Sequence, residues 1–130
     1  MKLLIAVLLL VFSTGAMAEW TYLTSVEDKT FDIYIDKTTI RKQGNVAKMW
    51  DMVDFKSPQK EADGKSYLSD KRLYEQDCVE IRRRLLTIIS FSDNMSKGEV
   101  TSTFQYDNNK WNDLAPDSIG MAEWKVACKK

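Results

Sequence analysis

Two cysteines and three consecutive arginines are the residues of this sequence whose types and spacing could do chemistry. The chain contains only two cysteines, Cys78 and Cys128. The first of them opens the stretch CVEIRRRLL, which also holds Arg82, Arg83 and Arg84. Thiols can form a disulfide, a redox pair or a metal site, and guanidinium groups can bind phosphate or carboxylate. The same arginines could equally lie on an ordinary strand that turns its charges to alternate faces.

Few residues of this chain could act in catalysis. Because it contains no histidine, Ser-His-Asp and Cys-His catalysis and histidine metal sites are excluded. Carboxylate chemistry of the kind used in glycoside hydrolysis has candidates in Asp32, Asp36, Asp51 and Asp54, but carboxylates on strands are far more often solvated or paired. The five glycines are scattered, so no Gly-rich phosphate loop is present. We therefore expect no enzyme activity, no catalytic residue, no cofactor and no metal.

Residues 1–18 have the pattern of a secretory signal peptide. Met1-Lys2 is a short basic start, residues 3–12 are an unbroken apolar run, and Ala16-Met17-Ala18 has the small-x-small form that signal peptidase cuts. The apolar run of about ten residues is too short for a bilayer, which needs roughly 20. We therefore expect an exported protein, periplasmic or secreted and not membrane-spanning, whose mature chain begins at Glu19.

Residues 19–130 are long enough for one domain with a modest core. Removal of the signal peptide removes Lys2 and no acid, which leaves 18 basic and 19 acidic residues. The resulting net charge near −1 argues against nucleic acid as a partner, because phosphate binding needs an excess of positive charge.

One disulfide is the simplest interpretation of two cysteines in an oxidising compartment. A bond between Cys78 and Cys128 would close a loop of about 50 residues, for which the chain-entropy account gives roughly 4 kcal/mol at most. A redox pair or a metal site is the alternative, but the chain has neither a Cys-x-x-Cys motif nor a histidine.

Hydrophobic periodicity predicts about six strands followed by one helix. The up-and-down order of the strands implies an antiparallel sheet. Near the C-terminus, Met121, Trp124 and Cys128 form one helical stripe, and Asp117-Ser118 suits its start. We predict an α+β fold in which the disulfide staples this C-terminal helix to one face of the sheet. The expected strands are residues 20–26, 31–36, 46–55, 67–78, 79–91 and 99–106, with a turn at Gly44-Asn45, a loop at 57–65 and a turn at 92–98.

Alternation along a strand would separate Arg83 from its two neighbours. Its flanking residues are apolar, which predicts that Arg83 pairs with a carboxylate, and Asp51 and Asp54 are the candidates. Arg82 and Arg84 would either ladder with acids on neighbouring strands or form a binding patch for an acidic partner. On this alternation one face carries Cys78, Glu80, Arg82 and Arg84, and the other carries Val79, Ile81, Arg83, Leu85, Thr87 and Ile89.

An ordered set of motifs, within about residues 20–128, resembles the bacterial surface-adhesin protein E family. The motifs are IYIDKTTIRKQGNVAKMWDMVDF, YLSDKRLYEQDCVEIRRRLL and WNDLAPDSIGMAEWKVAC. The resemblance implies an antiparallel sheet with a C-terminal helix held by the Cys78–Cys128 bridge. It also implies that some members bind host extracellular proteins such as vitronectin and laminin and can form homodimers.

Two functions are therefore expected for the domain over residues 19–130. The resemblance and the arginine-bearing strand favour a non-enzymatic adhesin that binds host extracellular matrix or plasma proteins, with Arg82 and Arg84 as binding residues. The surface-displayed adhesin of the family is a lipoprotein, whereas no cysteine lies near Ala18 here. That difference favours the alternative, a soluble periplasmic protein that binds an envelope partner and does not act in adhesion.

Overall fold

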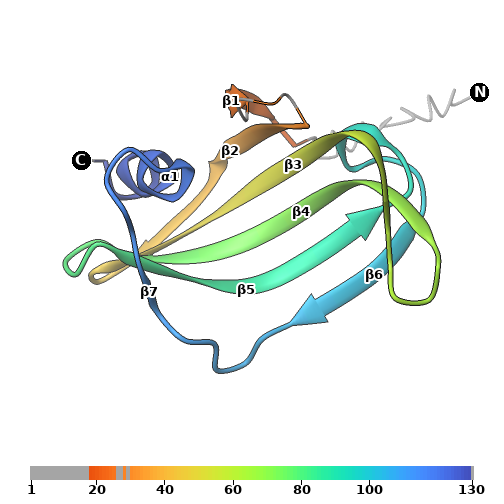
Figure 1. Cartoon of the computed structure of the whole chain (residues 1–130). Coiled ribbons are helices and arrows are strands. Elements are labelled where there is room, and N and C mark those ends of the chain that lie inside the picture. The colour runs from red at the N-terminus through yellow and green to blue at the C-terminus, as the bar shows by residue number, and fades with distance from the viewer. Residues whose placement is uncertain (1–17, 26–27, 29, 130) are drawn as a thin grey trace, which may run out of the picture.

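The chain folds into one antiparallel sheet with a short helix across one end of it (Figure 1). This computed structural model describes residues 18–25, 28 and 30–129. Apart from Ala18, the predicted signal peptide lies outside the described residues. Within the described part of the chain, no helix is long and apolar enough to cross a membrane.

The sheet has the predicted up-and-down order, in which neighbours in sequence are neighbours in the sheet from β1 to β6. A further pair of residues, β7, pairs with β5 next to β6; a strand this short cannot show a period in the sequence. The strands are β1 (Thr21–Ser25), β2 (Phe31–Gln43), β3 (Val46–Lys60), β4 (Ser66–Asp77), β5 (Arg82–Phe91), β6 (Val100–Gln105) and β7 (Asn112–Asp113).

β2 and β3 run further than their alternation predicts because each contains an irregularity. The register between β2 and β3 shifts after Asp36, and the register between β3 and β4 shifts after Asp54. Extra residues of this kind break the period of two, while the ladder continues beyond them. The observed loop is therefore shorter than the loop predicted at 57–65, because β3 passes through Pro58 and ends only at Lys60.

A turn at residues 78–81 separates β4 from β5, so the predicted break near Asp77 is confirmed. The expectation that Val79 and Ile81 share a strand face with Arg83 is wrong, because both lie in this turn and are exposed. Ile81 has a φ of 50°, a left-handed conformation that is strained for a β-branched residue.

A bulge in β5 corrects the expected faces further along the strand. Leu85 pairs with Tyr74 and Thr87 pairs with Leu73, which leaves Leu86 between them without a partner in the ladder. One extra residue turns every later side chain to the other face. Thr87 and Ile89 consequently lie on the face opposite Arg83 and Leu85, not on the same face as predicted.

The helix α1 (Ile119–Cys128) starts where the sequence predicts it. The side chain of Ser118 accepts a hydrogen bond from the N–H of Met121 at 3.1 Å, which is the usual bond of an N-cap. Lys129 takes a left-handed conformation and ends the helix. The apolar stripe of α1 packs on β2 and β3 in a core that contains Ile35, Ala47, Met49, Trp124, Ala127 and Cys128.

A helix of ten residues is about 15 Å long, whereas a strand of 15 residues such as β3 extends about 50 Å. The helix therefore covers only the end of the sheet that holds the β2–β3 and β4–β5 turns (Figure 1). Beyond the helix, the rings of Phe31 and Phe55 pack edge to face, with their centres 5.9 Å apart. Together with Ile119 of the helix they line a cavity of 270 Å³.

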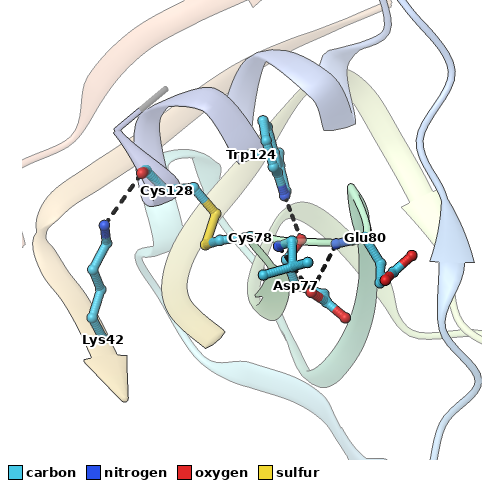
Figure 2. The surroundings of a disulfide bond; sticks show 7 residues. Lys42, Asp77, Cys78, Glu80, Trp124 and Cys128 are labelled. Carbon is cyan, nitrogen blue, oxygen red and sulfur yellow. Dashed lines mark hydrogen bonds between the residues drawn. A yellow bond between two sulfur atoms is a disulfide. The ribbon is translucent and has the colours of Figure 1, made fainter. Parts of the chain in front are cut away.

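The predicted disulfide joins Cys78, in the turn after β4, to Cys128 at the end of α1. Two hydrogen bonds support it (Figure 2). The indole Nε1 of Trp124 donates to the carbonyl oxygen of Asp77 at 2.8 Å, and Lys42 Nζ donates to the carbonyl oxygen of Cys128 at 3.2 Å. A cation there also complements the negative end of the helix dipole. The C-terminal end of the helix is thus tied to β2 and to the β4–β5 turn.

We expect Cys128→Ser to lower the melting temperature (Tm) and to loosen α1. The bridge closes a separation of 50 residues, for which the chain-entropy account gives about 4 kcal/mol at most. Thermal unfolding with and without reductant measures the effect: reduction should lower the Tm of the wild-type protein and leave the variant unchanged. Two free thiols in the exported protein, detected by mass spectrometry, would contradict the assignment.

Candidate functional site

The three arginines of β5 point to both faces of the sheet, as alternation predicts. Arg83 lies on the face that carries α1, where it pairs with Glu123. Arg82 and Arg84 lie on the opposite face, which we call the outer face. The expected placement of Cys78 on the face of Arg82 and Arg84 is wrong, because the turn before β5 brings Cys78 to the helix side.

Arg82 and Arg84 each pair with the residue directly opposite on β4. Arg82 Nε lies 3.0 Å from Asp77 Oδ2, and Arg84 Nη2 lies 3.2 Å from Glu75 Oε1. The ladder with acids on a neighbouring strand is therefore confirmed. With 37% of the Arg82 side chain and 25% of the Arg84 side chain exposed, both guanidinium groups remain partly accessible to a partner.

Trp111 stacks on both of these arginines. The centre of its ring lies 5.0 Å from Arg82 Cζ and 4.3 Å from Arg84 Cζ, within the range of cation–π attraction. The pairing of β7 with the start of β5 holds Trp111, the residue before β7, in this position. No pattern in the sequence predicts this role, because Trp111 lies in a polar stretch without periodicity.

Asp77 links the outer ion pairs to the β4–β5 turn. Its Oδ1 accepts the N–H groups of Val79 and Glu80 at 3.0 and 3.1 Å, while Oδ2 accepts from Arg82 (Figure 2 shows the turn bonds). The hydrogen bond from Glu80, followed by those from Arg82 and Val79, holds the pKa of Asp77 below its ordinary value despite some desolvation. Asp77 is therefore a firmly ionised partner that orients Arg82.

Further cations continue the outer face across the sheet. Arg41 of β2 lies opposite Lys48 of β3, Lys48 lies opposite Glu75 of β4, and Glu75 lies opposite Arg84. Arg41, Lys48 and Glu75 also line a cavity of 450 Å³. The outer face thus carries a row of three cations around one carboxylate, with Arg82 beside its end.

On the helix side, four charged residues form a buried charge network. Arg83 Nη1 lies 2.5 Å from Glu123 Oε2, and Arg72 makes two bonds to Asp51 through Nε at 2.8 Å and Nη2 at 2.5 Å. Asp51 and Glu123 are each 1% exposed. The predicted pairing of Arg83 with a carboxylate is confirmed, but the candidates Asp51 and Asp54 are wrong.

Neither predicted acid pairs with Arg83, for different reasons. Asp51 is occupied by Arg72, its direct neighbour on β4. Asp54 lies on the outer face and accepts bonds from the side chain of Asn94 and the N–H of Met95, both at 2.9 Å. The sequence does contain a signal for the true partner, Glu123, because it lies on the helix face that must be buried. That face has the spacing i, i+3, i+4, i+7 and consists of Gly120, Glu123, Trp124 and Ala127.

Burial raises the pKa of Glu123 well above its ordinary value, and the charge of Asp51 and a hydrogen bond between the two carboxyl groups act in the same direction. Arg83 and Arg72 oppose this shift. We conclude that the carboxyl pair holds a proton at a pH where an exposed glutamate has lost it, because two carboxylates in one buried site disfavour double ionisation.

The chain matches a family described as surface-adhesin protein E over residues 20–129. Its fold is similar to that of protein E from non-typeable Haemophilus influenzae, with a TM-score of 0.61, 12% identity, and coverage of 87% of this chain and 80% of that one. A second Haemophilus influenzae protein E structure gives a TM-score of 0.61 at 14% identity, with 83% of each chain covered. No curated protein sequence matches the chain significantly.

We expect Arg83→Ala to destabilise the protein, because it leaves the carboxyl group of Glu123 buried without its cation. Breaking such a pair costs about 3–5 kcal/mol when the carboxyl group is ionised, and less when it holds a proton. Urea unfolding of this variant at pH 7 measures the loss. Arg82→Ala, which removes a partly exposed pair from the same strand, is the matched control and should lose about 1 kcal/mol or less. Equal losses in the two variants would contradict the separation of the faces.

Glu123 should also make stability depend on pH. Since its pKa is raised in the folded state, its contribution is fully present below the unfolded pKa near 4.5 and is lost as pH rises through the folded value. In the wild-type protein the free energy of unfolding should therefore fall from pH 4.5 towards neutrality more steeply than in Glu123→Gln. Parallel pH profiles from urea unfolding would show that Glu123 does not hold the proton.

Proposed function

Since the chain belongs to the surface-adhesin protein E family, we propose that it is an exported, non-enzymatic, adhesin-like protein that binds a protein partner through its outer face. The observation that carries this proposal is the stacking of Arg82 and Arg84 on Trp111, on the sheet face opposite α1. Arginine and tryptophan are the residue types that most often dominate the energy of protein interfaces.

The charge of this site favours an acidic segment as its target. Arg82 uses Nε for Asp77 and Arg84 uses Nη2 for Glu75, and no other hydrogen bond of these two groups occurs within residues 30–129. Apart from the buried Nε of Arg84, their remaining N–H groups can donate to carboxylates of a partner. Arg41 and Lys48 extend the positive row and would steer such a partner towards the sheet.

The partner class that this surface fits is a host extracellular matrix or plasma protein of the vitronectin or laminin type, bound through an acidic stretch. The basis is family membership together with the outer arginines. Aromatic stacking by Trp111 rigidifies both guanidinium groups before binding, which lowers the conformational entropy that association would otherwise remove.

A second candidate is a periplasmic protein that binds an envelope partner and takes no part in adhesion. The observation that favours it is that Cys78 and Cys128 are joined to each other, so neither thiol can carry a lipid. The homodimer implied by the family resemblance stays a prediction.

Labelling of intact cells separates the two candidates. A membrane-impermeant amine reagent should modify exposed lysines of this protein on intact cells if it is an adhesin, and only after the outer membrane is opened if it acts in the periplasm. A known periplasmic protein in the same sample serves as the control for envelope integrity.

We expect Arg82→Gln/Arg84→Gln to weaken binding of an acidic host protein by about tenfold or more and to leave the fold intact. Loss of each charge-assisted bond accounts for roughly 1.5–3 kcal/mol. Charge reversal to Glu should weaken binding further but places like charges beside Asp77 and Glu75, so the Gln pair is the cleaner variant. Binding curves at low and high salt measure the effect, and the wild-type affinity should fall as salt rises.

Lys37→Gln/Lys60→Gln is the matched control, since both lysines are exposed and lie outside the outer row, and the pair removes the same two charges. This variant should bind like the wild-type protein. An equal loss in both pairs would mean that only net charge matters. An unchanged affinity in Arg82→Gln/Arg84→Gln would refute the outer face as the binding site.

A further inference from the structure

A buried carboxylate receives the start of the mature chain. The backbone N–H of Glu19 donates to Asp36 Oδ2 at 3.2 Å, and Asp36 is only 2% exposed. The other oxygen, Oδ1, accepts the N–H and the hydroxyl group of Thr38 at 3.0 and 2.5 Å. Its hydrogen-bonding capacity is largely filled, but every one of these donors is a neutral group.

No cation within residues 18–25, 28 and 30–129 forms a salt bridge with Asp36. Asp36 lines a cavity of 530 Å³ together with Arg41 and Lys71, but both cations interact with other groups. Arg41 Nη1 donates to the carbonyl oxygens of Thr38 and Ile40, and Lys71 Nζ lies 4.7 Å from the centre of the Trp50 ring. A buried carboxylate is usually paired with a cation. Among the described residues, Asp36 lacks such a cation.

We propose that Asp36 is the receptor for the α-ammonium group formed when the chain is cut between Ala18 and Glu19. Hydrolysis by a signal peptidase adds one water across this bond and leaves a carboxylate on Ala18 and an amine on Glu19, which takes up a proton at neutral pH. The nitrogen that donates one neutral N–H to Asp36 in the uncut chain then carries a positive charge and three N–H groups. This inference rests on the export that forms part of the proposed function.

The new ion pair would strengthen the edge of the sheet. Glu19 precedes β1, an edge strand of five residues, and Asp36 lies on β2 where its register shifts. Leu23 of β1 packs against the core beneath α1. Pairing of the new terminus with Asp36 therefore fixes both the edge strand and a side chain that covers the core, so the processed chain gains stability that the precursor lacks.

The test compares two forms of the chain, one that begins at Glu19 with a free amine and one that retains Met17-Ala18 before it. The free form should melt roughly 3–8 °C higher, the shift expected when a domain of this size gains one charge-assisted bond. Asp36→Asn should abolish the difference between the two forms. Asp63→Asn, which changes an exposed carboxylate in the β3–β4 loop, is the matched control and should preserve it.

Titration of the Glu19 amine by NMR provides a second measurement. The pKa of this amine would not change if Asp36 had only a structural role. The charge of Asp36 should raise the pKa of this amine above the ordinary range of about 7.7–8.0, against the opposing charges of Arg41 and Lys71. In Asp36→Asn the amine should titrate in the ordinary range. If that variant fails to fold, the titration of the wild-type protein still decides the question.

Three results would overturn the proposal: equal Tm values for the two forms, an ordinary pKa for the Glu19 amine, or an exported protein whose sequenced N-terminus is not Glu19. None of these measurements involves a binding partner. A protein that fixes its terminus but binds no acidic target would refute the binding function alone, so the two failures can be told apart.

Discussion

The ion pair between Arg83 and Glu123 determines how the two faces of the sheet are used. Because Glu123 is almost fully buried, its carboxyl group needs a partner on the sheet, and Arg83 is the arginine of β5 that points to that side. Alternation then forces Arg82 and Arg84 to the outer face. The same pairing that docks the helix therefore exposes the arginines that are available for binding.

Specific docking matters because the helix has little stability of its own. Ten residues are marginal as an isolated helix in water, and a buried ion pair contributes little net stability over an apolar contact of the same size. The apolar core and the disulfide supply the stability, while Arg83, Arg72 and Asp51 specify where Glu123 must lie. A helix rotated by one residue would separate Glu123 from Arg83 and leave both charges without their partner.

Much of this architecture follows from the sequence because it depends on local patterns. Alternation along the strands predicts the up-and-down sheet, the terminal stripe predicts α1, and the isolated cysteine pair predicts the bridge to Cys78. What the sequence does not predict depends on single extra residues or on non-local pairing. The bulge at Leu86 reverses the faces of half of β5, and Trp111 reaches Arg84 only through the pairing of β7 with β5.

The irregularity in β2 places Asp36 and Arg41 on the same face of the sheet. Asp36 lies opposite Trp50, and Arg41 lies opposite Lys48, so five steps along β2 correspond to only two along β3. That odd difference turns Arg41 to the same face as Asp36, whereas a regular strand would place the two on opposite faces. The extra residues also place Thr38 where its N–H and hydroxyl group can reach the Asp36 carboxylate. One bulge thus supplies both the carboxylate receptor for the chain terminus and the first cation of the outer row.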